Sequence, residues 1–135
     1  MREATLDDMP RLLEMGQRFH AASEMPCGFS NEAIAGLLTN LISEPSGAVL
    51  ISGGGVIGGA LSPAYCDPDW IMAVELFWWA EDRQGLRLLK SFEDWAEASG
   101  ANEVRMTTLS SLPSADRIIR RKGYQPTEIS YSKVI

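Results

Sequence analysis

The 135-residue sequence predicts one mixed α/β (α+β) domain in which a single sheet is flanked by about four helices. Segments with helical spacing of apolar residues alternate with short β-branched runs, and no repeat or long linker separates them. The composition, 45% hydrophobic and 22% charged, is typical of a globular chain long enough to bury one core. We therefore expect residues 1–135 to form a single domain.

Two helices are expected in the first third of the chain. The first follows a cap at Thr5 or Asp7 and continues to about Ala21, with apolar residues at helical spacing. The second begins after Ser30 and ends before Pro45. A short strand is expected before the first helix.

The remaining elements predict a hairpin and then alternating strands and helices. Three glycines between two apolar runs favour a hairpin turn. The strands are expected at 48–52, 56–61, 72–79, 103–109 and 128–135, and the helices at 86–99 and 114–122.

The segment Met72–Gly100 carries the strongest functional signal. A strand that is apolar on both faces leads into a charged turn containing Gly85, and then into an amphipathic helix. Such a turn directs unpaired N–H groups and the positive end of the helix dipole at one point. It therefore predicts a phosphate or pyrophosphate site.

Glu75 is the one charged residue in that strand. An extended strand places it on a face with Ala73, Phe77 and Trp79, where apolar neighbours disfavour the ionised form. A carboxylate of this kind is a candidate general base near neutral pH. Alternatively, backbone N–H groups or a cation hold Glu75, and it only shapes the site.

Several classes of function are disfavoured by composition. The net charge of −6 argues against nonspecific nucleic-acid binding. Two cysteines and one histidine without metal-ligand spacing predict no metal site. No apolar run is long enough for a bilayer, and charged residues follow Met1 directly. We therefore expect no membrane association and a cytoplasmic location.

The order of elements and several motifs resemble the GNAT superfamily of N-acetyltransferases over nearly the whole chain. Arg2-Glu3-Ala4 followed by Asp7-Asp8 is similar to the opening strand and helix of that family. The hairpin 48–61 is similar to its second and third strands, and Met72–Trp95 to its cofactor segment. Arg120-Arg121-Lys122-Gly123-Tyr124 resembles its usual helix end.

The resemblance implies a mostly antiparallel central sheet and an enzyme that transfers an acetyl group from acetyl-CoA to a primary amine. Transfer would be direct, in a ternary complex, with Glu75 at the position of the glutamate that several members use as base. Backbone groups at Phe77, Trp78 and Trp79 would hold the pantetheine arm. The residues expected at the diphosphate are Arg83, Gln84, Gly85, Leu86 and Arg87.

The sequence also departs from the family pattern. In the family turn Q/R-x-x-G-x-G/A, Gly85 fits the last position, but Arg83 replaces the first glycine and Ala80 the Gln or Arg. Ile119 stands where many members have the tyrosine that protonates the leaving thiolate. A CoA-binding or protein-interaction module without catalysis therefore stays open.

A structural protein that forms a homodimer through Trp78 and Trp79 is a third alternative. The acceptor pocket is expected from the first two helices and the loop Ser62–Trp70. The weaker candidates are Tyr65 and Cys66 in that loop, His20 as a surface residue, Tyr124 and Tyr131 as packing residues, and Ser110 and Ser111 as cofactor or capping groups.

Overall fold

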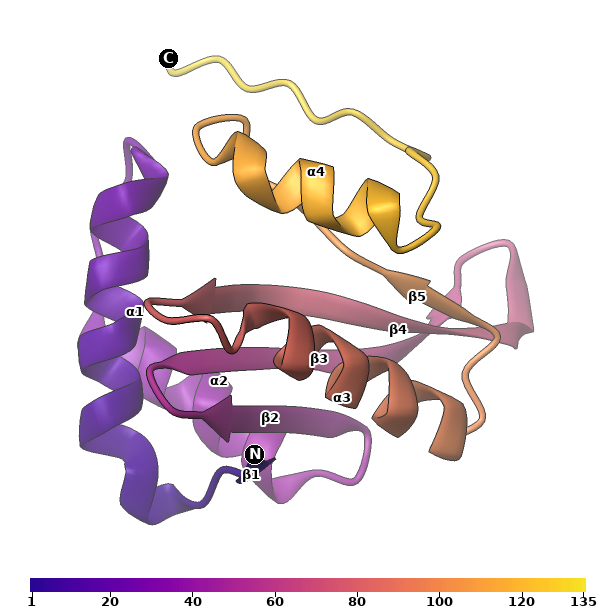
Figure 1. Cartoon of the computed structure of the whole chain (residues 1–135), viewed down its shortest axis with the longest axis horizontal. Helices are drawn as coiled ribbons and strands as arrows, with labels where there is room; N and C mark the ends of the chain where they lie inside the picture. Colours follow the sequence, from indigo (N-terminus) through magenta and orange to yellow (C-terminus); the bar gives the residue numbers. More distant parts are fainter.

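The computed structural model describes all 135 residues and contains a five-stranded sheet with helices on both faces (Figure 1). The strands follow the order β1-β2-β3-β4-β5, and all neighbours are antiparallel except β4 and β5. This confirms the predicted fold class. The strands are β1 (Arg2–Glu3), β2 (Gly47–Ser52), β3 (Gly55–Ala64), β4 (Asp67–Ala80) and β5 (Glu103–Arg105).

Four α-helices flank the sheet, and a 3₁₀ turn (Leu6–Asp8) precedes the first. The cap predicted at Ser30 is present, because its Oγ accepts a hydrogen bond from the Ala33 amide at 3.1 Å. Thr5 precedes the 3₁₀ turn, and its amide donates to Asp8 at 2.8 Å. The helices are α1 (Met9–Ser23), α2 (Asn31–Ser43), α3 (Gly85–Ala98) and α4 (Pro113–Arg121).

The sheet separates two hydrophobic cores. On one face, α1 and α2 bury residues such as Met15 and Leu38 against β2 and β3. On the other face, α3 buries Leu88 and Phe92 against Ile57. All five side chains are at most 3% exposed, so β4 lies between two well-packed layers.

Two predicted strands differ from the structure at the C-terminal side. The strand at 103–109 ends at Arg105, because the chain then leaves β4. The strand at 128–135 does not form, although Glu128 pairs with Arg105 at 3.1 Å. The alternation of apolar and polar residues in 128–135 is not enough to form a strand. A strand also needs a neighbouring strand edge in register, and β5 is too short to supply one. Tyr131 is 88% exposed, so its predicted packing role is wrong.

Candidate active site

The sheet opens between β4 and β5. These parallel strands pair over three residues only, where Met72–Val74 lie beside Glu103–Arg105. Beyond that point β4 continues to Ala80 beside β3, while the chain after β5 turns toward α4 (Figure 1). The edge of β4 from Glu75 to Ala80 that faces away from β3 therefore has no strand partner. Its free N–H and C=O groups are available to an extended ligand that binds like an added strand.

A β-bulge lies beside this opening. Gly58 of β3 lies opposite Phe77 of β4. Its neighbour Gly59 lies opposite Glu75, so Leu76 has no partner residue. The bulge needs both glycines: a Cβ on Gly58 would lie 2.2 Å from the Phe77 ring, and one on Gly59 would lie 2.2 Å from a backbone oxygen of β4.

The bulge overturns one prediction about Glu75. An uninterrupted strand would place Glu75 on the same face as Ala73, Phe77 and Trp79. In the structure Ala73 packs in the core under α3, whereas Phe77 and Trp79 pack against the core under α1 and α2. Because Leu76 is an additional residue, the alternation of side chains reverses there. Glu75 therefore lies on the face of β4 turned away from the two aromatic residues.

The Glu75 carboxylate lies in the gap where the strands separate. It is 5% exposed, and its Oε2 accepts a hydrogen bond from the Thr107 amide at 2.9 Å. Burial raises its pKa to about 7, and the Thr107 hydrogen bond opposes this rise. A carboxyl group that titrates near neutral pH suits a general base. The same hydrogen bond joins β4 to the chain after β5. It is also what the alternative role requires, in which backbone N–H groups hold Glu75 and the residue only shapes the site.

The turn before α3 leaves three backbone donors free. Asp82 accepts hydrogen bonds from an amide of the β2–β3 turn at 2.8 Å and from the Gln84 amide at 3.0 Å, and these bonds hold its pKa below its usual value. The amides of Gly85, Leu86 and Arg87 donate no hydrogen bond within the chain. Together with the positive end of the helix dipole, these amides form a site suited to an anion.

Two cations flank these amides. Arg83 and Arg87 are exposed, and neither forms an ion pair within the chain. A Cβ on Gly85 would lie 3.6 Å from that of Ala80, an ordinary contact, so alanine fits there as well as glycine. The Gln84 side chain instead accepts a hydrogen bond from β2 at 2.8 Å. The structure thus brings the five predicted diphosphate residues to one helix start.

The two tryptophans of β4 point to opposite faces, as predicted. The Trp78 indole donates to the Gly85 carbonyl at 3.1 Å and packs against the core under α3. The Trp79 indole donates to Glu81 at 3.1 Å, and its ring meets Phe19 edge-on at 5.7 Å. Contacts within the chain therefore fix both side chains.

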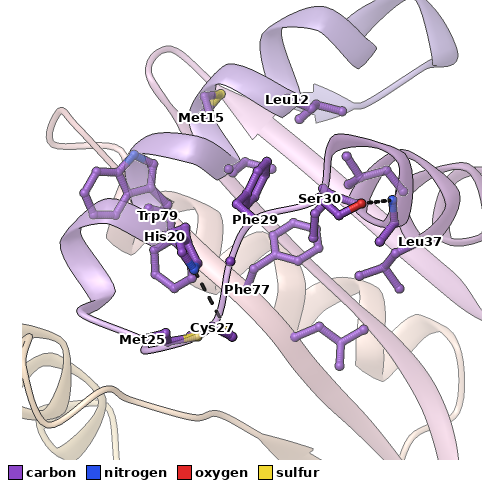
Figure 2. A pocket seen from close by; sticks show the side chains of 18 residues that line it. Leu12, Met15, His20, Met25, Cys27, Phe29, Ser30, Leu37, Phe77 and Trp79 are labelled. Atoms are coloured by element: carbon purple, nitrogen blue, oxygen red, sulfur yellow. Dashed lines mark hydrogen bonds between the residues drawn. The ribbon is translucent and has the colours of Figure 1, made fainter.

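An apolar cavity of about 360 Å³ lies on the α1 and α2 side of β4 (Figure 2). Its walls come from α1, the loop joining α1 to α2, α2 itself, and strands β3 and β4. A cavity therefore lies at the first two helices, where an acceptor pocket was expected, and its use by an acceptor stays a prediction. Side chains labelled in Figure 2 include Met15, His20, Phe29, Leu37, Phe77 and Trp79.

The expected contribution of the loop Ser62–Trp70 is wrong. Most of this segment extends β3 and β4, and Pro63 is accommodated where their register shifts. Tyr65 and Cys66 are exposed in the turn at the far end of the hairpin and do not line the cavity.

Sequence reasoning missed the loop between the first two helices. Met25, Cys27 and Phe29 of this loop line the cavity, and His20 lies there rather than on the open surface. The His20 ring lies 5.6 Å from that of Phe29, and its Nε2 is 4.0 Å from the Cys27 sulfur. The available signal was the presence of Met and Phe in a short connecting loop, because such side chains seldom occur there without a packing partner.

No group of three or more His, Cys, Asp or Glu side chains is arranged to hold a metal ion. No helix has both the length and the apolar character needed to cross a membrane.

No protein-family model and no curated protein matches the sequence. Solved structures match its fold. A predicted acetyltransferase from Clostridium acetobutylicum, solved with acetyl-CoA, has a TM-score of 0.80 at 10% identity, over 98% of this chain and 94% of that chain. The aminoglycoside N-acetyltransferase AAC(6')-Iy, solved with CoA, has a TM-score of 0.73 at 16% identity, over 98% and 92%. A transcriptional regulator from Bacillus halodurans C-125 has a TM-score of 0.74 at 14% identity, over 99% and 97%.

This chain has the GNAT acetyltransferase fold. The fold prediction based on the strand-turn-helix segment and the order of elements is therefore confirmed.

The position expected for the acid of a GNAT enzyme holds no hydroxyl group. Ile119 is 9% exposed and packs inside the molecule. The nearby Tyr124 donates its hydroxyl to Glu93 at 2.8 Å, and burial together with this carboxylate raises its pKa. Tyr124 is therefore half-buried and joined to α3 by this hydrogen bond. Ser111 donates to the Ser23 carbonyl at 3.1 Å, so it ties the chain after β5 to α1 rather than capping α4.

Proposed function

We propose that this protein is an N-acetyltransferase that moves the acetyl group of acetyl-CoA directly to a primary amine in a ternary complex. One observation carries the proposal: the unpaired edge of β4, with Glu75 beside it, runs toward the unpaired amides at the start of α3. Acetyl-CoA or CoA in the neighbouring structures supports the choice of cofactor.

The unpaired edge of β4 suits the pantetheine arm of CoA, and the start of α3 suits its diphosphate. The amides of the pantetheine arm would pair with free backbone groups at Phe77–Trp79. The diphosphate would bind the amides of Gly85, Leu86 and Arg87, between the side chains of Arg83 and Arg87. An arginine at a helix N-terminus opposes the dipole, and a bound anion offsets this repulsion.

The chemistry assigned to Glu75 is removal of a proton from the acceptor ammonium through water, because its carboxylate lies on the face of β4 opposite the cavity. The amine nitrogen then attacks the thioester carbonyl carbon, an N–C bond forms, the nitrogen loses its second proton to solvent, and the C–S bond breaks. The CoA thiolate leaves with the electron pair. Because Ile119 has no proton to give, solvent supplies the proton that the thiolate takes up.

The acceptor would occupy the cavity beside Phe77 and Trp79. A homodimer stays a prediction, which sedimentation of the wild-type chain and a Trp78→Ala variant would test.

Isothermal titration with acetyl-CoA, followed by an assay of thiol release with amines, tests the proposal. We expect binding and amine-dependent release of CoA. Binding without release from any amine would favour the CoA-binding module, which the substitutions at Arg83 and Ile119 allow. Absence of binding at millimolar acetyl-CoA would overturn both.

The binding site itself can be checked with a matched pair of variants. Gly85→Ala adds a Cβ that the structure accommodates, so we expect wild-type affinity. Gly85→Asp places a negative charge at the anion site, and like charges at about 4 Å cost roughly 1–4 kcal/mol. Acetyl-CoA should therefore bind about tenfold or more weakly to Gly85→Asp. Equal affinity of the two variants would place the diphosphate elsewhere.

A further inference from the structure

The lining of the cavity under α1 and α2 restricts what it can bind. Of its 18 lining residues, 14 are hydrophobic, and none is Asp, Glu, Lys or Arg. The other four are two glycines, His20 and Ser30, and the Ser30 hydroxyl already accepts a hydrogen bond from the Ala33 amide. Figure 2 shows the aromatic rings of Phe29, Phe77 and Trp79 around this space.

This lining offers no carboxylate to a second positive charge. An ammonium group taken from water into an apolar site needs a carboxylate or several acceptors, since an unpaired buried charge is costly. His20 Nε2 and the Cys27 sulfur lie 4.0 Å apart, and no carboxylate lines the cavity beside them. A polyamine or an amino sugar would therefore lose hydration without compensation. An aliphatic or aromatic group would gain by burial.

The cavity ends at the bulge of β4. Leu76, the residue without a partner, lines it, and Glu75 is the preceding residue. An apolar group bound in the cavity would place its attached amine beside Leu76, at the bulge where the β4–β5 opening begins, and the Glu75 carboxylate lies on the other face of the strand. The volume of about 360 Å³ lies at the lower end of the range for small-molecule sites.

We infer that the acceptor is a small monoamine that carries one apolar or aromatic group, and that the cavity binds this group. The inference rests on the proposed function, because it identifies the cavity as the acceptor site of the acetyl transfer.

Two kinds of measurement test it independently of each other. In the thiol-release assay at saturating acetyl-CoA, kcat/KM for 2-phenylethylamine should exceed that for methylamine by roughly 10- to 100-fold, the value of burying one such group. Spermidine and neamine should be no better than methylamine. A preference for either polycation would overturn the inference and leave the proposed function intact.

Ligand-detected NMR with 2-phenylethylamine and spermidine gives a readout that needs no turnover. Binding of the aromatic amine alone supports the inference even if the protein has no catalytic activity. If acetyl-CoA binds but 2-phenylethylamine neither binds nor reacts, the inference fails.

A matched pair of variants locates the binding. Ala33→Phe adds a ring to the cavity lining, whereas Gly36→Phe adds one on the same helix outside it, where a Cβ meets no atom within 4 Å. We expect kcat/KM for 2-phenylethylamine to fall at least tenfold in Ala33→Phe and to stay at the wild-type value in Gly36→Phe. Both variants should retain their affinity for acetyl-CoA, which checks that they fold. Equal effects of the two variants would exclude the cavity as the binding site.

Discussion

The two faces of β4 are built from different chemistry. On the α3 side, the site consists of backbone donors, two free arginines and one buried carboxylate. On the α1 and α2 side, it consists almost entirely of apolar side chains. A single extra residue, Leu76, separates the two arrangements, because the bulge reverses the alternation along the strand.

This difference suggests that the two faces of β4 have separate functions. The α3 side would bind the cofactor and carry the proton transfer, since charge and free donors lie there. The α1 and α2 side would select the acceptor by burial.

The largest expected effect is on turnover after Glu75→Gln. Loss of a general base typically costs about 10²- to 10⁴-fold, so kcat should fall by that range while the KM for acetyl-CoA changes little. The comparison variant is His20→Gln, which alters a polar side chain that lines the cavity on the opposite face. Steady-state kinetics should show that it changes mainly the KM for the amine. A larger loss of kcat from His20→Gln than from Glu75→Gln would reverse the functions of the two faces.

A second effect of the same carboxyl group appears in stability. Its pKa is about 7 in the folded protein against an ordinary value of 4.5, so between these values the folded state binds more protons than the unfolded state. The stabilisation by Glu75 is therefore complete below about pH 4.5, falls as pH rises, and is lost above pH 7. The shift corresponds to about 3 kcal/mol.

Urea unfolding at several pH values measures this dependence. Glu75→Gln cannot ionise, and its amide oxygen can still accept the Thr107 hydrogen bond. The free energy of unfolding of the variant relative to wild type should therefore rise by about 3 kcal/mol between pH 4.5 and 8. Parallel curves for the two proteins would mean that Glu75 does not titrate in this window and is held by its hydrogen bond.

The two faces also differ in how far the sequence could predict them. The α3 side comes from one continuous segment, so an apolar strand, a charged turn and a helix start were enough to place Glu75 and Arg83–Arg87 together. The cavity joins Met15, Phe29 and Trp79 from three separate segments, and only tertiary packing brings these together. The bulge was also hidden, because its cause is the close contact between Gly58 and Phe77 on different strands.

The smallest effect concerns the arginines of the cofactor side. Removing both charges, as Arg83→Ala/Arg87→Ala, should weaken acetyl-CoA binding about 5- to 30-fold, since exposed charge contacts contribute roughly 0.5–1 kcal/mol each. The effect should shrink as salt is raised, because exposed charges are screened. Lys90→Ala is the control: this cation lies in the same helix, beyond its first turn, and pairs with Asp94. Titration calorimetry at low and high salt would show whether Lys90→Ala matches the double variant. If it does, the net charge of α3 rather than the geometry of the turn attracts the cofactor, and the α3 side loses its specific anion site.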